Sequence, residues 1–97
     1  MTRVRMGPGD DLAALVRAAE GEAVLVMLDP ALDALELARA RAAIGPLAVE
    51  RAPTTRVNAL LAGADADPAD VEAAARFLEG ARSTTGQVLE VSPPSGS

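Results

Sequence analysis

The fold is decided between residues 21 and 63, where the chain reads GEAVLVMLDPALDALELARARAAIGPLAVERAPTTRVNALLAG. Two largely apolar runs, residues 23–28 (AVLVML) and 56–62 (RVNALLA), stand on either side of a long segment rich in Ala, Leu, Glu and Arg. A continuous apolar run is typical of a strand buried on both faces, as in a parallel sheet, and the intervening residues are strong helix formers. The stretch therefore predicts a β–α–β unit with parallel strands.

The helix between the two strands is expected over residues 31–44, with Asp29 as its N-cap and Pro30 in its first turn. The pair Gly45-Pro46 follows directly. A proline in a helix interior loses one hydrogen bond and clashes with the preceding turn, which costs about 3 kcal/mol. We therefore expect a kink or a break at Pro46, followed by a further helical turn through Arg51.

Upstream of this unit we expect a short helix and a leader. Asp10 or Asp11 caps the helix, apolar residues recur with helical spacing from Leu12 onward, and Gly21 ends it. Residues 1–9 end in the breaker sequence GPG and are expected to form a flexible leader.

Downstream, Asp67 is expected to cap a third helix that Pro68 opens, and residues 86–91 (GQVLEV) to form a third strand. The tail, residues 92–97 (SPPSGS), is polar and proline-rich and is expected to be disordered. Residues 10–91 then form a single α/β domain. Its architecture is predicted to be a truncated Rossmann-like, three-stranded parallel sheet with flanking helices.

The composition excludes several kinds of chemistry. The 97 residues contain no Cys, His, Trp or Tyr, and all nine basic residues are Arg, which removes disulfides, imidazole bases, Schiff-base lysines and Cys/His metal cages. The net charge of −5 argues against nucleic-acid binding. No apolar run reaches the roughly 18–20 residues of a membrane span, and no apolar signal region follows the first residues. We expect a cytoplasmic protein with no nucleic-acid or membrane partner, and the Arg-rich usage suggests a bacterial source.

Two stretches resemble the short-chain dehydrogenases/reductases. Residues 47–63 (LAVERAPTTRVNALLAG) resemble the segment of that family in which a helix ends and the next strand reads RVN before a Pro-Gly turn. Residues 70–91 (DVEAAARFLEGARSTTGQVLEV) resemble the closing helix, TGQ turn and final strand. The resemblance covers roughly residues 23–91 and corresponds to the C-terminal half of such an enzyme.

The resemblance implies site residues that this chain lacks. The family binds its dinucleotide on a Gly-rich turn after its first strand, which has no counterpart here. Its catalytic Tyr and Lys align without gaps to Asp33 and Leu37, and no Ser precedes Ser83 to match the catalytic Ser. An ordinary Asp, with a pKa of about 4, stays ionised at neutral pH and cannot replace the Tyr. Of the Pro-Gly turn beside the nicotinamide only Gly63 matches, and it is the one candidate remnant of a cofactor site.

Other polar residues have structural explanations. Asn58 is expected to hydrogen-bond neighbouring backbone at a buried position rather than to bind a ligand. Arg56 is expected to be a solvated residue where its strand begins, and the hydroxyls of residues 83–85 have no base to activate them. Four acidic residues lack the spacing of an EF-hand loop, so that helix capping explains them better than calcium does: Asp65, Asp67, Asp70 and Glu72.

What remains resembles the associating half of the enzyme without the reacting half. In the resembled family, the helices that flank the catalytic strand, the closing helix and the last strand supply oligomer contacts. The first hypothesis is therefore a non-catalytic companion subunit, a pseudoenzyme that docks onto a full-length short-chain reductase or onto itself. The helix at 31–51 and the strand at 86–91 would carry the interface, through Arg39, Arg41, Val88, Leu89 and Val91. For Arg39, the alternative is a solvated pair with Glu36.

Two alternatives stay open. The chain is one piece of a split NAD(P)-dependent oxidoreductase, in which Gly63 and its neighbours line the nicotinamide of a shared active site. Otherwise it is a decayed enzyme fragment. Under each hypothesis the chain is no enzyme on its own and binds no cofactor on its own, with NAD(P) entering only through a shared assembly.

Overall fold

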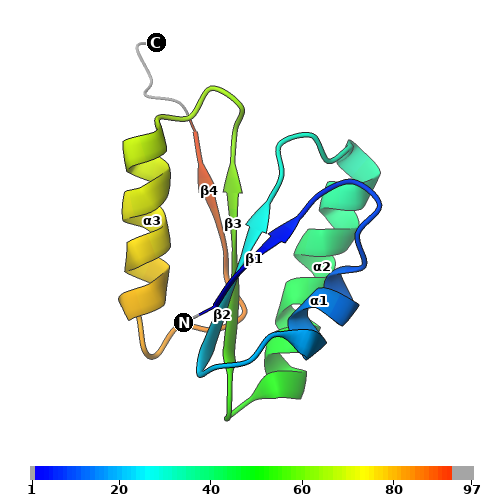
Figure 1. The fold of residues 1–97 in the computed structure, drawn as a ribbon, viewed down its shortest axis with the longest axis vertical. Coiled ribbons are helices and arrows are strands. Elements are labelled where there is room, and N and C mark those ends of the chain that lie inside the picture. The colour runs from blue at the N-terminus through cyan, green and yellow to red at the C-terminus, as the bar shows by residue number, and fades with distance from the viewer. Residues whose placement is uncertain (1, 93–97) are drawn as a thin grey trace.

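The computed structural model describes residues 2–92, which form a parallel sheet with helices on both faces (Figure 1). The strands lie in the order β1-β2-β3-β4, and every neighbouring pair is parallel. The predicted α/β class and Rossmann-like parallel sheet are confirmed, with four strands rather than three. Along the chain the elements are β1 (Thr2–Met6), α1 (Leu12–Ala18), β2 (Ala23–Leu28), α2 (Ala34–Arg51), β3 (Arg56–Ala62), α3 (Pro68–Gly80) and β4 (Val88–Val91).

The additional strand comes from the segment predicted to be a flexible leader, and that prediction was wrong for residues 2–6. These residues pair in register with β2, from Thr2 beside Val24 to Met6 beside Leu28. In TRVRM, apolar and charged residues alternate, which is the period-two signal of a strand covered differently on its two faces. The signal is only five residues long and ends at the GPG breaker. Residues 93–97 of the predicted tail lie outside the described residues.

Helix α2 begins later than predicted. Its N-cap is Asp33 and not Asp29, because Asp33 Oδ1 accepts a hydrogen bond from the Glu36 amide at 2.7 Å and the Glu36 carboxylate accepts one from the Asp33 amide at 3.4 Å. This reciprocal arrangement is a capping box, which satisfies two amides that the helix leaves free. Asp29 instead accepts a hydrogen bond from the Ala31 amide in the turn before the helix.

Of the kink or break expected at Pro46, the break does not occur, because α2 runs through the proline to Arg51. Pro46 is exposed, so that its ring projects away from the sheet. On the inner face, Ile44, Leu47 and Ala48 are buried on the strands. Packing on both sides of the proline therefore holds the helix together although one backbone hydrogen bond is missing.

Helices α1 and α2 cover one face of the sheet, and α3 covers the other (Figure 1). Because the strand order advances in one direction, the crossover through α3 must have the opposite hand to the first two. With β1 nearest the viewer and the strands pointing up, the first two crossovers are right-handed and the third is left-handed (Figure 1). A left-handed crossover is rare in parallel sheets. It sends the loops that leave β2 and β3 to opposite faces.

Arg3 ties β1 to α3 across the face that α3 occupies. Its Nε lies 2.7 Å from Glu79 Oε2, and its Nη1 lies 2.9 Å from Glu72 Oε2. Hydrogen bonds from the Arg3 guanidinium hold the pKa of both glutamates below the usual value. The two ion pairs connect the edge strand β1 to α3, which packs on the sheet face that carries the Arg3 side chain.

The Arg3 cluster predicts an acid-sensitive contribution to stability. Glu72 and Glu79 have lowered pKa values in the folded state, so their contribution is present above the unfolded pKa and is lost as the pH falls through the folded values. We expect the Arg3→Met variant to be less stable than the wild type at neutral pH and to lose part of the acid dependence below about pH 5. Urea unfolding at neutral and acidic pH measures both effects.

The matched control is Arg5→Met, on the same strand and the same face, because Arg5 forms no ion pair with any described residue. Its stability should stay within about 0.5 kcal/mol of the wild type. Identical acid dependence in the wild type and in Arg3→Met would contradict the assignment.

Candidate functional site

The loops that leave β2 and β3 diverge, and a crevice opens between them at the carboxyl ends of the strands. Ligands of open α/β sheets bind in such crevices. Two hollows lie there, of about 360 Å³ and about 230 Å³, and Pro30 and Ala62 line both of them. The larger also contacts Leu37 and Gly63, whereas the smaller is closed by Arg5 from β1 together with Met27 and Val71.

The larger hollow brings together two of the three positions that the resemblance aligned with site residues. Leu37 and Gly63 both line it, whereas Asp33 does not and uses its carboxylate as the cap of α2. The Gly63 amide donates to the Val91 carbonyl at 3.1 Å, so that it belongs to the β3–β4 pairing. Among the lining residues only Glu90 ionises. The hollow therefore has no proton donor or acceptor at the Leu37 position, where the side chain is aliphatic.

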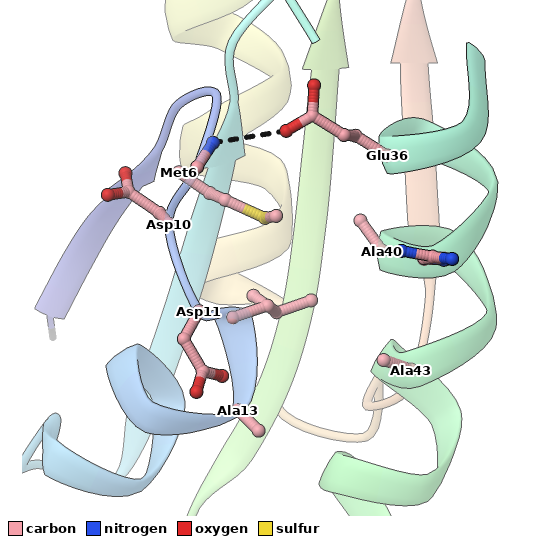
Figure 2. Close-up of a pocket in the computed structure, with 10 residues that line it drawn as sticks. Met6, Asp10, Asp11, Ala13, Glu36, Ala40 and Ala43 are labelled. Atoms are coloured by element: carbon pink, nitrogen blue, oxygen red, sulfur yellow. Dashed lines mark hydrogen bonds between the residues drawn. The ribbon is translucent and has the colours of Figure 1, made fainter. Parts of the chain in front are cut away.

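A third hollow, also of about 360 Å³, lies between the β1–α1 loop and α2 (Figure 2). Figure 2 shows Met6, Ala13, Ala40 and Ala43 around it, with acidic side chains along the rim. Each rim acid already accepts a backbone hydrogen bond: Asp10 from Gly7 at 2.8 Å, Asp11 from Ala14 at 3.1 Å and Glu36 from Gly9 at 3.1 Å. These acids close turns and caps. Among residues 2–92 no group of three potential metal ligands forms.

The comparison with protein families agrees with this architecture. A family described as short chain dehydrogenase-like protein, SDR-like, matches residues 8–91 of the chain. The chain belongs to the SDR-like family. Nothing among the curated proteins or the solved structures matches it. The family assignment confirms the resemblance carried by the RVN and TGQ segments.

In this SDR-like chain, Asn58 has the structural role predicted for it. It is 3% exposed, its Nδ2 donates to the Thr84 carbonyl at 2.9 Å, and its Oδ1 accepts from the Gln87 amide at 3.0 Å. The amide thereby fixes both sides of the turn that ends at Gly86, whose φ of +78° favours glycine. Asn58 thus holds the α3–β4 connection in the SDR-like fold.

The prediction that Arg56 is solvated was wrong. Its guanidinium is half-buried and donates to the Ala81 carbonyl at 2.6 Å and the Glu79 carbonyl at 3.2 Å, at the carboxyl end of α3. The last turn of α3 contains no basic residue of its own, and a cation is favoured at the negative end of a helix dipole. A helix end without a basic residue is the only sequence signal for this contact.

Two of the four acidic residues that were assigned to capping have different roles in the structure. Asp67 caps α3 as predicted and accepts from the Ala69 amide at 2.8 Å. Glu72, which was also assigned to capping, instead pairs with Arg3 and with Arg76. The pair with Arg76 has a local signal, its i,i+4 spacing, whereas the pair with Arg3 has none, because Arg3 lies on another element.

The residues predicted to contact a partner lie on two neighbouring elements. Arg39 is exposed, and it does not pair with Glu36, whose carboxylate is committed to the cap of α2. Arg41 Nη2 lies 3.7 Å from Glu90 Oε2, which joins α2 to β4. The three apolar residues of β4 are partly buried against the two cores: Val88, Leu89 and Val91. No helix among residues 2–92 has the length and apolarity needed to cross a membrane.

The two hydrogen bonds of Asn58, to Thr84 and from Gln87, form what we call the Asn58 clamp, and they predict how a substitution changes the stability. The Asn58→Leu variant leaves the Gln87 amide and the Thr84 carbonyl without their partner in a part-buried place, which should lower the free energy of unfolding by about 1–3 kcal/mol. Urea denaturation followed by circular dichroism measures the change. Ser83→Ala, at an exposed position in the same turn, is the control and should stay within about 0.5 kcal/mol. An equally small change for Asn58→Leu would argue against the clamp.

Proposed function

We propose that this SDR-like chain is a non-catalytic companion subunit, which acts by associating with a full-length short-chain reductase or with a second copy of itself. Two features support the non-catalytic part of the proposal. The position aligned with the family's Tyr is an Asp that caps a helix, and the position aligned with its Lys is an aliphatic side chain, Leu37. The chain contains neither Tyr nor Lys elsewhere.

The observation that carries the association is the outward face of α2. Leu35 is 59% exposed and Val49 is 77% exposed, and they are two of the three large apolar side chains exposed among the described residues. Exposed Ala38, Ala42 and Pro46 lie between them at helical spacing, opposite the buried face of the helix. We call these five residues the α2 seam. An exposed apolar stripe of this kind is typical of a helix that packs against another helix.

The α2 seam has nearly the same pattern in both directions, with a large residue at each end and small residues in the middle. Two antiparallel helices centred on Ala42 would place Leu35 of one beside Val49 of the other. The small residues between them would let the two backbones approach closely. A self-complementary surface of this kind suits a two-fold interface between two copies, and it equally suits a related helix of a reductase.

A second surface supports association through α3 and β4. Phe77 is the only aromatic residue of the chain, and its side chain is 65% exposed. Glu72 and Glu79 mark the flank of α3 that faces β1, and Phe77 points away from that flank. It therefore lies on the flank toward β4, the strand that ends the sheet on this side. An exposed aromatic near an open strand edge is typical of a contact surface.

The α2 seam gives the first test of association. Ala42→Glu places a charge at its centre and should weaken self-association or reductase binding at least tenfold. Analytical ultracentrifugation of the chain alone, and of its mixture with a purified full-length reductase, measures the change.

The control is Ala69→Glu, an exposed change in the first turn of α3, where an acidic residue is favoured by the helix dipole. It should leave association intact. A wild-type chain that stays monomeric at high concentration and binds no reductase would overturn the proposal.

A split oxidoreductase is the second candidate, and one observation favours it. Leu37 and Gly63 line the same hollow at the carboxyl ends of the strands, where open α/β sheets bind ligands. In that case, a partner subunit would supply the reacting groups and bind NAD(P), and this chain would form one wall of the shared site.

Gly63→Val distinguishes the two candidates in an assembly with a reductase. Gly63 is exposed and has no positive φ, so that the valine introduces bulk without backbone strain. If the chain is a companion subunit, kcat/KM of the assembly should match that of the control Ala69→Val. A loss of tenfold or more confined to Gly63→Val would favour the split enzyme instead.

A further inference from the structure

The outer side of β1 is an open edge of the sheet. Met6 accepts a hydrogen bond from the Asp29 amide at 2.9 Å, which shows that the backbone of Met6 faces β2. Backbone groups alternate in direction along a strand of a parallel ladder, so the amides and carbonyls of Arg3 and Arg5 point outward. Within residues 2–92 no strand pairs with this edge. Such an edge is a template for a further strand.

The sheet face beside this edge is also incompletely covered. Helix α3 packs against β2, β3 and β4, whereas parallel sheets are usually covered over the whole of both faces. Over β1 this face carries the side chains of Arg3 and Arg5. Arg3 is neutralised by its two glutamates, but Arg5 is exposed and has no ion-pair partner among the described residues. Arg5 borders the hollow of about 230 Å³ beside Met27.

We propose that the outer edge of β1 binds an extended acidic segment of another protein as a fifth strand, with a carboxylate of that segment against Arg5. The outward amides and carbonyls of Arg3 and Arg5 supply main-chain hydrogen bonds to the added strand. Because side chains alternate along a strand, every second residue of the segment lies on the same face as the Arg5 guanidinium. Main-chain pairing supplies affinity, and the alternating side chains supply specificity.

Charge argues against a second copy of this chain as the occupant. Two β1 edges paired antiparallel with Arg5 opposite Arg5 would place these two unpaired cations on the same face, whereas Arg3 adds no repulsion because its glutamates neutralise it. Like charges opposite each other on neighbouring strands are destabilising. A segment with acidic residues at alternate positions reverses the sign of this interaction. The unpaired charge of Arg5 therefore favours an acidic strand over a second β1 edge in that register.

The probe is a fluorescent peptide in which valine and glutamate alternate, titrated with the full chain and followed by fluorescence anisotropy. One comparison peptide has lysine in place of glutamate. A second keeps the glutamates and carries N-methyl groups on alternate amides, which blocks strand pairing. The unmodified acidic peptide should bind at least tenfold more tightly than either comparison peptide. Equal binding of all three peptides, or no binding, overturns the proposal.

Two charge-reversal variants locate the site. Arg5→Glu should reverse the preference, so that the lysine peptide binds more tightly than the glutamate peptide. Arg82→Glu changes the net charge equally but lies at the other end of the strands, in a hollow with Glu22 and Pro53, and should keep the wild-type preference. If both variants lose the acidic peptide equally, the effect is one of net charge and the proposal fails. Circular dichroism verifies that each variant is folded, and Arg5→Gln, which removes the charge without reversing it, should lose most of the preference.

This inference does not depend on the α2 seam. Ala42→Glu, which should weaken association through the seam, should bind the acidic peptide as the wild type does. Loss of peptide binding in Ala42→Glu would mean that the peptide reports on the seam, and the edge proposal would then be wrong.

Discussion

The parallel pairing of β2 with β3 is the contact on which the rest of the structure depends. Both strands are buried on both faces, with Val26 and Ala59 toward α1 and α2, and Leu25 and Leu60 toward α3. Parallel neighbours cannot be joined by a tight turn, so this pairing requires a crossover, and α2 supplies it. The buried residues Leu47 and Ala48 beyond the proline explain why α2 continues through it. A break in the helix would remove its last buried turns from the sheet.

Arginine side chains hold the ends of two helices in place through hydrogen bonds to backbone carbonyls. Arg51 donates to the carbonyls of Val16, Arg17 and Ala19 and so closes the end of α1, as Arg56 closes the end of α3. A guanidinium offers several donors in a fixed plane, which a lysine does not. In a chain with one aromatic residue and a core rich in alanine, these hydrogen bonds fix helix ends that apolar packing secures only weakly.

The parts of the fold that were predictable are those determined by neighbours in sequence. The boundaries of β2, β3 and α3 follow from apolar runs and from Asp67-Pro68, all of which are local signals. The cap of α2 was misassigned because Asp29-Pro30 satisfies one rule for a helix start, whereas Asp33 and Glu36 satisfy a more specific one. The hand of the last crossover has no local signal at all. In the candidate site, the family alignment marked Leu37 and Gly63 one by one. Their shared hollow and the bond from the Gly63 amide to Val91 depend on how the strands pair and have no local signal.

The α2 seam and the β1 edge suit different kinds of partner, and this difference limits how the proposed assembly could be built. The α2 seam is apolar and would suit a second copy of itself, whereas the β1 edge carries one unpaired positive charge, that of Arg5. A two-fold pair built on the seam would leave both β1 edges open, because the seam lies on the outward face of α2, which packs over β3 and not at the β1 edge. Association through the seam therefore does not use up the edges, and a second class of partner can bind to the same assembly. In the proposed assembly, the unpaired charge of Arg5 would also disfavour joining such pairs through β1 edges with Arg5 opposite Arg5.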